Sequence, residues 1–461
     1  MAKLLRIPSI ERKIGIEVYA SKTRGIGGAI KCSSDDFIVE EILTNGFRAS
    51  VKLEDNKMGS PADHGRYLIC VLIKRGWDTL LAVERIAKAI GVSPDRIDFA
   101  GIKDTNALTA QYVSVGGVPP NRIMSLKIRG LLIKPLGFSD WKITPQKLFG
   151  NRFKVTVRSI KLRESTIRRR IERINSEISD YGGIPNFFGH QRFGTVRPIT
   201  HLVGKHLIKG DFEKAVLTFL SYESPFENPK TRMLRRELGE TMDFKAALKS
   251  LPRGLIYERL ILTHLSRSPN DFLGALHRIP ISLRRLFVQA YQSFLFNRFL
   301  SERVKRGLPL KEAQAGDYVV KLSSLGLPER EFVRAEAKNI SAINREIQRG
   351  GMALALPLIG LKQQPSGGLQ GEIEKEILEE EDLSQEDFRN PRMIKVNILG
   401  GLRLALAKTM NLKVSIMKES IKPSRNSVKS SFTLYKGAYA TILLREFMKP
   451  PTDEQLIKSG F

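Results

Sequence analysis

Two patterns of hydrophobic and polar positions alternate along the first 180 residues. Residues 37–43 and 67–74 are rich in β-branched and aromatic side chains and are bounded by turn formers, which predicts strands. Residues 78–91 place apolar side chains at helical spacing, with Asp78 positioned as an N-cap and Gly91 as a C-terminal stop. The alternation predicts a mixed α+β fold.

A further strand and helix are predicted next along the chain. Phe153, Val155 and Val157 alternate with polar or basic residues, so one face of this strand is buried and the other is basic. Residues 167–178 then place four isoleucines on one stripe of a helix whose other face carries arginines. After the two glycines at 182–183, the hydrophobic pattern changes to one that predicts longer helices.

The clearest of the longer patterns predicts a helix over residues 283–306, which Gly307 would end. Leu286, Ala290 and Phe294 fall on its apolar side, and several basic residues, Arg303 among them, are expected to face solvent.

Two later segments differ from these helical patterns in their charge and in their hydrophobic spacing. Residues 372–387 hold nine acids and a single lysine, which predicts a solvated helix or a flexible connection. Residues 430–444 return to strand-like alternation.

The composition narrows the class of partner. The 461 residues include 76 Lys and Arg against 48 Asp and Glu, a formal net charge of +28, which indicates a polyanionic partner. The length suggests two or three domains. The basic residues are spread along the whole chain, which argues against a membrane-surface helix, and the longest apolar stretch, at 352–361, is too short for a membrane span. We expect a cytoplasmic protein.

The cysteines and histidines give little support for a metal site. Cys32 and Cys70 have no CxxC spacing and are interpreted as reduced, small core residues. His190, His201 and His206 have no carboxylate at ligand spacing beside them, so no metal is expected.

The strongest candidate for chemistry is Asp104. It lies in FAGIKDTNALTAQYVS, residues 99–114, in a turn between two strand-like runs. From spacing alone the turn has two interpretations: a surface turn whose aspartate bonds its own backbone, or a loop that displays a nucleophile.

The full set of motifs resembles the tRNA pseudouridine synthase D (TruD) family, in an archaeal-like form. In that family the catalytic aspartate follows Gly-x-Lys, as Asp104 follows GIK here. Other blocks occur in the family's order. These are GIGGAIKCSSDDFIVEEI (25–42), GNRF (150–153), NFFGHQRFG (186–194) with the following RPITHLVGKHLIKGDFEKAV, YQSFLFN (291–297) and FTLYKGAYATILLRE (432–446). Two positions depart from the family: Thr105 stands where a basic residue is usual, and GLRL, ending at Leu404, replaces Gly-x-Arg-Arg.

The resemblance implies isomerisation of uridine to pseudouridine in tRNA, at position 13 in the D arm. Such a reaction breaks the N1–C1′ bond and joins C5 to the same carbon, so it needs neither redox change nor a cofactor. Asp104 would add to the sugar or base, or remove a sugar proton, and the sequence leaves this choice open. A carboxylate that stays charged in a water-excluding pocket needs a nearby cation, for which Lys31 and Lys103 are the candidates.

The same resemblance suggests roles for further side chains. Phe153 would stack on the flipped base and Asn151 would hold a sugar or base edge. Phe432 is assigned to substrate binding. Gln191 and Arg192 would contact RNA phosphate or the domain junction. Glu41 is interpreted as a structural partner of a basic residue.

The implied architecture is a catalytic domain of residues 1–183 and 405–461, an α+β core on a mostly antiparallel mixed sheet. An α/β domain characteristic of the family, residues 184–404, would be inserted between its two parts. The expected partner is tRNA, bound by a monomer. The alternatives are an inactive RNA chaperone of the same fold, or a synthase acting on ribosomal or messenger RNA.

Overall fold

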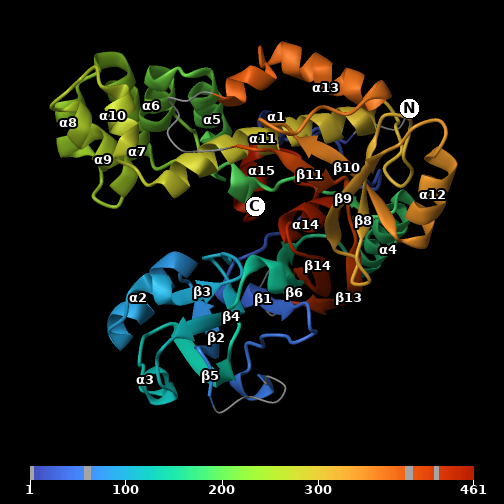
Figure 1. Ribbon diagram of the computed structural model, residues 1–461, viewed down its shortest axis with the longest axis horizontal. Helices are drawn as coiled ribbons and strands as arrows, with labels where there is room; N and C mark the ends of the chain where they lie inside the picture. The colour runs from blue at the N-terminus through green and yellow to red at the C-terminus, as the bar shows by residue number, and fades with distance from the viewer. Residues whose placement is uncertain (1–4, 57–63, 390–397, 420–424) are drawn as a thin grey trace.

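The computed structural model describes residues 5–56, 64–389, 398–419 and 425–461, and its largest element there is an eight-stranded sheet (Figure 1). The strand order is β13-β14-β6-β1-β4-β2-β5, and β3 pairs with β4 outside this path. The strands are β1 (Phe37–Leu43), β2 (Tyr67–Arg75), β3 (Ile97–Phe99), β4 (Leu108–Gly116), β5 (Leu131–Ser139), β6 (Leu148–Ile160), β13 (Thr409–Lys418) and β14 (Asn426–Tyr435).

The sheet is antiparallel except between β1 and β4, where Ile38 lies opposite Leu108 in parallel register. This confirms the α+β class with a mostly antiparallel mixed sheet. β1 has the predicted bounds, and β2 extends one residue beyond the prediction.

Two smaller sheets lie between the two groups of strands along the chain. One has the order β11-β10-β8-β9 and the other pairs β12 with β7. Their strands are β7 (Ile184–Pro185), β8 (Tyr318–Leu322), β9 (Pro328–Arg334), β10 (Met352–Leu358), β11 (Gly401–Leu404) and β12 (Leu406–Ala407). The β7–β12 pairing places residues 184–185 beside 406–407, so the two ends of the predicted insertion lie together. The division of the chain into domains at 183 and 405 stays a prediction.

Helices cover the sheets and form most of the upper part of Figure 1. The α-helices are α1 (Ser9–Lys13), α2 (Thr79–Ile90), α3 (Pro120–Met124), α4 (Glu164–Tyr181), α5 (Thr200–Lys209), α6 (Phe212–Ser221), α7 (Pro229–Thr241), α8 (Phe244–Ser250), α9 (Ile256–Leu265), α10 (Phe272–His277), α11 (Ile281–Lys305), α12 (Ile340–Arg349), α13 (Gly368–Glu380), α14 (Ala440–Met448) and α15 (Asp453–Lys458). Short 3-10 helices are η1 (Ser34–Asp36), η2 (Leu53–Asp55), η3 (Pro94–Arg96), η4 (Pro145–Lys147), η5 (His190–Arg192) and η6 (Gln385–Arg389). None of the described helices is long and apolar enough to cross a membrane.

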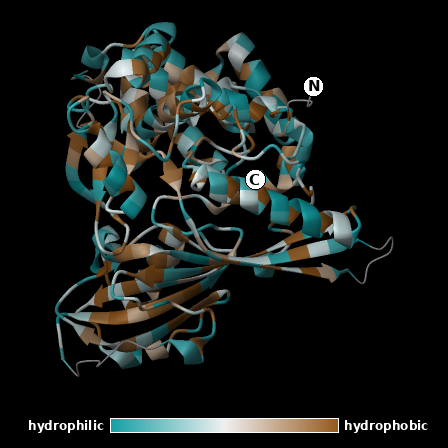
Figure 2. Cartoon of the chain, turned by 90° about the vertical axis from the view of Figure 1, so that its right-hand side faces the viewer, coloured by the Kyte–Doolittle hydropathy of each residue, from teal (hydrophilic) through white to brown (hydrophobic). Residues whose placement is uncertain are grey.

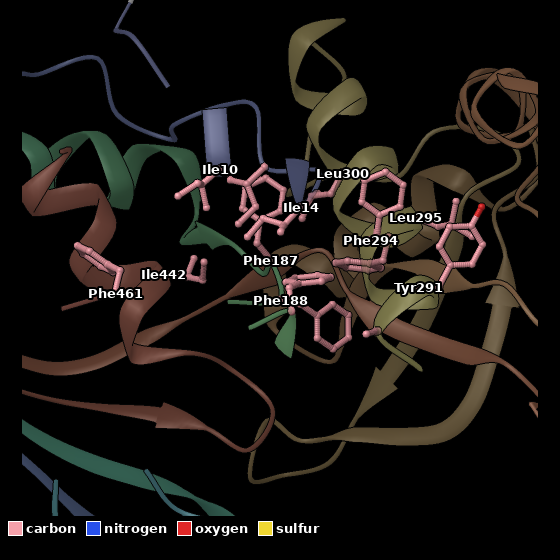
Figure 3. Close-up of a cluster of buried hydrophobic side chains, with 14 of the residues drawn as sticks. Ile10, Ile14, Phe187, Phe188, Tyr291, Phe294, Leu295, Leu300, Ile442 and Phe461 are labelled. Atoms are coloured by element: carbon pink, nitrogen blue, oxygen red, sulfur yellow. The ribbon is translucent and has the colours of Figure 1, made fainter. Parts of the chain in front are cut away.

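The largest hydrophobic core joins segments far apart in the sequence. Ile10 and Ile14 of the N-terminal segment meet Phe187, Phe294 of α11 and Ile442 of α14 in one cluster (Figure 3). Figure 2 shows hydrophobic residues along the strands of the large sheet, while the helices carry both hydrophobic and hydrophilic bands. The N-terminal segment, α11 and α14 are therefore held together by shared burial of apolar surface.

The caps of α2 follow the prediction. The Asp78 carboxylate accepts hydrogen bonds from the backbone N–H groups of Leu80 and Leu81, and Gly91 ends the helix in the left-handed conformation. The four isoleucines of α4 are all buried, as predicted.

Two side chains of α11 are placed differently from the prediction. Arg303, expected in solvent, is fully buried and forms an ion pair with Asp317, with Nη2 2.8 Å from Oδ2. Leu286, expected on the apolar side, is exposed. A helix covered on several sides has no single solvent face, so its periodicity does not assign each position correctly.

Three further predictions need correction. The alternation of residues 430–444 is a strand only to Tyr435, because α14 begins at Ala440. Cys70 is a buried free thiol as predicted, but Cys32 is exposed. The acidic segment forms α13 and η6, yet Glu374 is buried there, and burial raises its pKa to about 7.

Candidate active site

Asp104 lies in the loop of residues 100–107, between β3 and β4. Since β1 and β4 are parallel, the segments that precede them meet at the same edge of the sheet. This topology brings Lys31, 73 positions earlier in the chain, to Asp104: Lys31 Nζ is 3.2 Å from Asp104 Oδ1. The side chains are 12% and 30% exposed respectively, so the ion pair remains open to a ligand on one side.

Three side chains hold the backbone of the Asp104 loop. Lys74, fully buried on β2, donates from Nζ to the carbonyl oxygens of Asp104 (2.8 Å), Lys103 (3.2 Å) and Trp77 (2.7 Å). The hydroxyl of Thr79 accepts from the Lys103 N–H, and Gln111 Nε2 donates to the Gly101 carbonyl. The loop is thus fixed before any ligand arrives.

Lys103 points away from Asp104. Its Nζ lies 2.6 Å from Glu41 Oε1 and donates to Asn151 Oδ1 at 2.9 Å. Glu41 is fully buried and its other oxygen accepts the Tyr112 N–H. Of the two candidate cations, Lys31 therefore pairs with Asp104, while Lys103 binds Glu41 and orients the Asn151 amide.

A cavity of about 490 Å³ opens beside this loop, within the range typical of small-molecule sites. Its wall contains predicted site residues from three separate segments: Lys103 and Asp104, Asn151 and Phe153, and Gln191. Phe37, which was not predicted, also lines it, whereas Lys31 is not among the described lining residues. The remaining lining residues are Val39, Asp78, Gly101, Ile102, Thr105, Leu148 and residues 437–441.

Phe153 and Phe432 lie directly opposite each other on β6 and β14, and their rings stack with centroids 5.4 Å apart. Phe153 reaches the cavity, whereas Phe432 is absent from its described lining and is buried behind Phe153. The position of Phe432 thus fits support of the Phe153 ring better than contact with a ligand.

Gln191 and Arg192 follow the tight backbone at Gly189 but point to different places. Gln191 lines the cavity and its Oε1 accepts from the Thr441 hydroxyl at 3.2 Å. Arg192 instead donates to Ser293 and Gln289 of α11. Burial lowers the pKa of the Arg192 guanidinium. Both partners lie with Arg192 inside the predicted inserted domain, so this contact does not cross the domain junction, and a contact of Arg192 with RNA phosphate stays a prediction.

Comparisons with known proteins show the family of this chain. A family model described as "tRNA pseudouridine synthase D (TruD)" matches residues 13–447. The chain belongs to the TruD family. A relative from Methanococcoides burtonii is 35% identical over 444 residues, covering 96% of this chain and 98% of the relative, and one from Methanopyrus kandleri is 40% identical over 385 residues, covering 83% and 86%. Both are named "Probable tRNA pseudouridine synthase D".

The fold comparison gives the same result. The crystal structure of a TruD protein from Methanosarcina mazei matches with a TM-score of 0.80 at 35% identity, covering 97% of this chain and 99% of that one. The resemblance noted in the sequence motifs is thereby confirmed.

Three residues around this TruD cavity are missing from the sequence-based site. The only sequence feature that marks Lys74 is a lysine in an otherwise apolar strand. Tyr439 lines the cavity and follows the YKG turn of a quoted motif. Arg403, in the departing GLRL block, donates to the Gly437 carbonyl and to Asn186, and lies 4.0 Å from the Phe188 ring centroid. It therefore ties the 437–441 wall to residues 186–188.

His190 and His201 have separate surroundings. His190 Nε2 is 3.4 Å from the buried Glu11 carboxylate, and His201 stacks on Phe294. Burial lowers the pKa of His201 to about 3. No group of three His, Cys, Asp or Glu side chains that could hold a metal ion occurs in the described part of the chain.

Proposed function

We propose that this protein is a tRNA pseudouridine synthase that uses Asp104 to isomerise a uridine of the D arm, at position 13. The observation that carries the proposal is the partly exposed carboxylate of Asp104, which lines a 490 Å³ cavity and pairs with Lys31, in a chain of the TruD family.

The surroundings of Asp104 suit a rearrangement that neither adds nor removes atoms from the base. The N1–C1′ bond breaks, the uracil turns, C5 bonds to C1′, the C5 hydrogen leaves as a proton, and N1 takes up a proton. Asp104 stabilises or traps the separated sugar or base, and Lys31 balances the charge of its carboxylate. No step calls for a redox partner.

Two neighbouring side chains are suited to holding the detached uracil. Lys103 donates to Oδ1 of Asn151, which leaves the Asn151 Nδ2 group to donate to an oxygen of the nucleotide. The Phe153 ring offers an apolar surface for stacking, which offsets part of the cost of extruding the base.

The function is tested with an unmodified tRNA transcript carrying tritium at uracil C5. We expect the protein to release tritium to water from this transcript. Replacing uridine 13 with cytidine is expected to abolish the tritium release that comes from the D arm. Equal release from both transcripts would move the target to another uridine. Tight tRNA binding without any release would instead favour the inactive RNA chaperone or another RNA substrate.

Replacing Phe153 with leucine is expected to lower the single-turnover rate by about tenfold while changing the Kd for tRNA much less. A base–aromatic stack contributes about 1–3 kcal/mol, and leucine keeps the site apolar but removes the ring. The rate at saturating tRNA and the Kd are measured separately.

Phe149→Leu is the matched control, because Phe149 lies on the same strand, packs against Tyr435 and is outside the described cavity wall. Equal losses from the two variants would assign Phe153 to core packing alone. A loss seen only with Tyr439→Leu would transfer the stacking role to Tyr439.

A further inference from the structure

A second, larger cleft lies away from Asp104. It has a volume of about 790 Å³ and shares no described lining residue with the first cavity. Its walls are the Gly25–Gly28 turn with Ala29, the end of β6, α4, and the chain around α14 and α15. Figure 1 labels β6, α4, α14 and α15. Between Phe153 at the first cavity and Lys161 at the second, β6 and the residue after it span about 25 Å.

The charge of this second cleft is one-sided. Seven basic side chains line it, and no carboxylate appears among its described lining residues. Lys458 is paired with Glu454, and Lys449 donates to oxygens of Ser21 and Thr23. The other five form no ion pair with any described residue: Arg6, Arg24, Lys161, Arg170 and Arg425.

The arrangement of these cations is unusual for surface charge. Many basic residues elsewhere in the described chain have acidic partners, whereas the positive charges of Arg24 and Arg170 repel each other. Burial and the neighbouring Arg24 both lower the pKa of Arg170. Concentrating uncompensated like charge in a concave site costs free energy, and a bound polyanion would recover that cost.

The glycine-rich wall of the cleft is fixed and open. The N–H groups of Ile26 and Gly27 donate to the carbonyls of Phe447 and Met448, and the Gly25 carbonyl accepts from Arg170 at 2.5 Å. Apart from Gly27 and its two neighbours in the chain, no described atom lies within 4 Å of the place where a Cβ would stand on Gly27, whose φ is +66°. A ligand can therefore approach the backbone closely at this turn.

We propose that this cleft binds the phosphodiester backbone of the same tRNA, at a stretch remote from the uridine held at Asp104. Arginine and lysine in a groove that lacks acids are the side chains that bind phosphate in nucleic-acid complexes. The turn at Gly25–Gly28 leads directly into Lys31, so the chain segment that would bind the backbone also carries the cation of the active site. The inference rests on the proposed function, since it takes tRNA as the polyanion.

The test removes three charges with the triple variant Arg24→Gln, Lys161→Gln, Arg425→Gln. None of these side chains forms an ion pair with a described residue, and all three are exposed or half-buried, so the fold is expected to survive. The matched control, called the α8 control, is Lys245→Gln, Lys249→Gln, Arg253→Gln in α8 and the turn after it, where three exposed cations likewise form no ion pair with any described residue. The Kd for unmodified tRNA is measured over a range of salt concentrations, along with the tritium-release rate at saturating tRNA.

For the cleft variant we expect a Kd about 10- to 100-fold higher and a salt slope lower by about 2 to 3, since each phosphate contact contributes about 0.7–0.9 to the slope. The rate at saturation should stay unchanged. A minimal D-arm hairpin, too short to span both sites, should bind the variant and the native protein equally. The α8 control should keep the native slope for tRNA.

Three results would overturn the proposal. The first is an unchanged slope in the cleft variant, and the second is an equal loss in the α8 control. The third combines two observations: inorganic pyrophosphate stabilises the native protein but not the cleft variant, and both proteins bind tRNA equally. That result would identify the cleft as a small-anion site. Failure of the proposed function is separate: it would appear as no tritium release by the native protein, whatever the salt slopes.

Discussion

Asp104→Asn is expected to lower the rate of uridine isomerisation at least about 10³-fold, with a change of less than about threefold in the Kd for tRNA. Asparagine has nearly the same shape and can still accept a hydrogen bond from Lys31, but it is neither a nucleophile nor a base. Single-turnover tritium release at saturating tRNA measures the rate, and filter binding measures the Kd. A large fall in rate with binding intact would place Asp104 in the chemical step.

The matched control is Asp78→Asn, because Asp78 lines the same cavity. Its carboxylate caps α2 by accepting two backbone N–H groups, and asparagine is an equally good N-cap. We expect this variant to stay within about threefold of the native rate. Similar losses in both variants would mean that the cavity needs its negative charge in general, and substantial activity in Asp104→Asn would remove the nucleophile role.

Local physics explains which elements the sequence predicts well. The bounds of β1, the caps of α2 and the stripe of α4 each follow from residues close together in the chain, where spacing alone decides which face is buried. The same reasoning fails for Arg303, since its partner Asp317 comes from a later segment and satisfies a charge that periodicity assigns to solvent.

The candidate site shows the same division. The motifs indicate Asp104, Lys31, Lys103 and Glu41, but the pairing among them depends on the parallel register of β1 and β4. Lys103, adjacent in sequence to Asp104, binds Glu41, while the distant Lys31 reaches the carboxylate. Side-chain types can thus be predicted from the motifs, whereas ion-pair partners require the fold.

The role of Lys74 could not be predicted from the motifs, because its contacts are all with backbone carbonyls that no motif encodes. Three carbonyls accept from one buried ammonium, and a neutral amine has only two N–H groups to give them. Burial lowers the pKa of Lys74 from 10.5 to about 8, against the opposing effect of the Asp104 carboxylate. Loss of this proton would leave one carbonyl of the loop facing a lone pair.

Lys74→Met is therefore expected to lower the rate at saturating tRNA by about 10²-fold with little change in Kd, because a misplacement of about 1 Å at a reacting group can cost that much. In the native protein the rate should fall as the pH rises through about 8, while in the variant it should be low and flat across that range. Rates are measured by tritium release between pH 6.5 and 9.5.

The effect of Lys74 on stability should have the opposite sign. Between pH 8 and 10.5 the unfolded chain binds more protons at this lysine than the native chain does, so its contribution makes the free energy of unfolding rise with pH. The difference between native protein and Lys74→Met in denaturant titrations isolates this contribution from that of Lys449, whose pKa burial also lowers to about 8. Lys134→Met is the control, since Lys134 lies on β5 of the same sheet and donates to the Leu53 carbonyl of η2, away from the Asp104 loop. A rate profile in Lys74→Met that still fell through pH 8 would assign that titration to another group. A native-like rate in Lys74→Met would leave Lys74 without a positioning role.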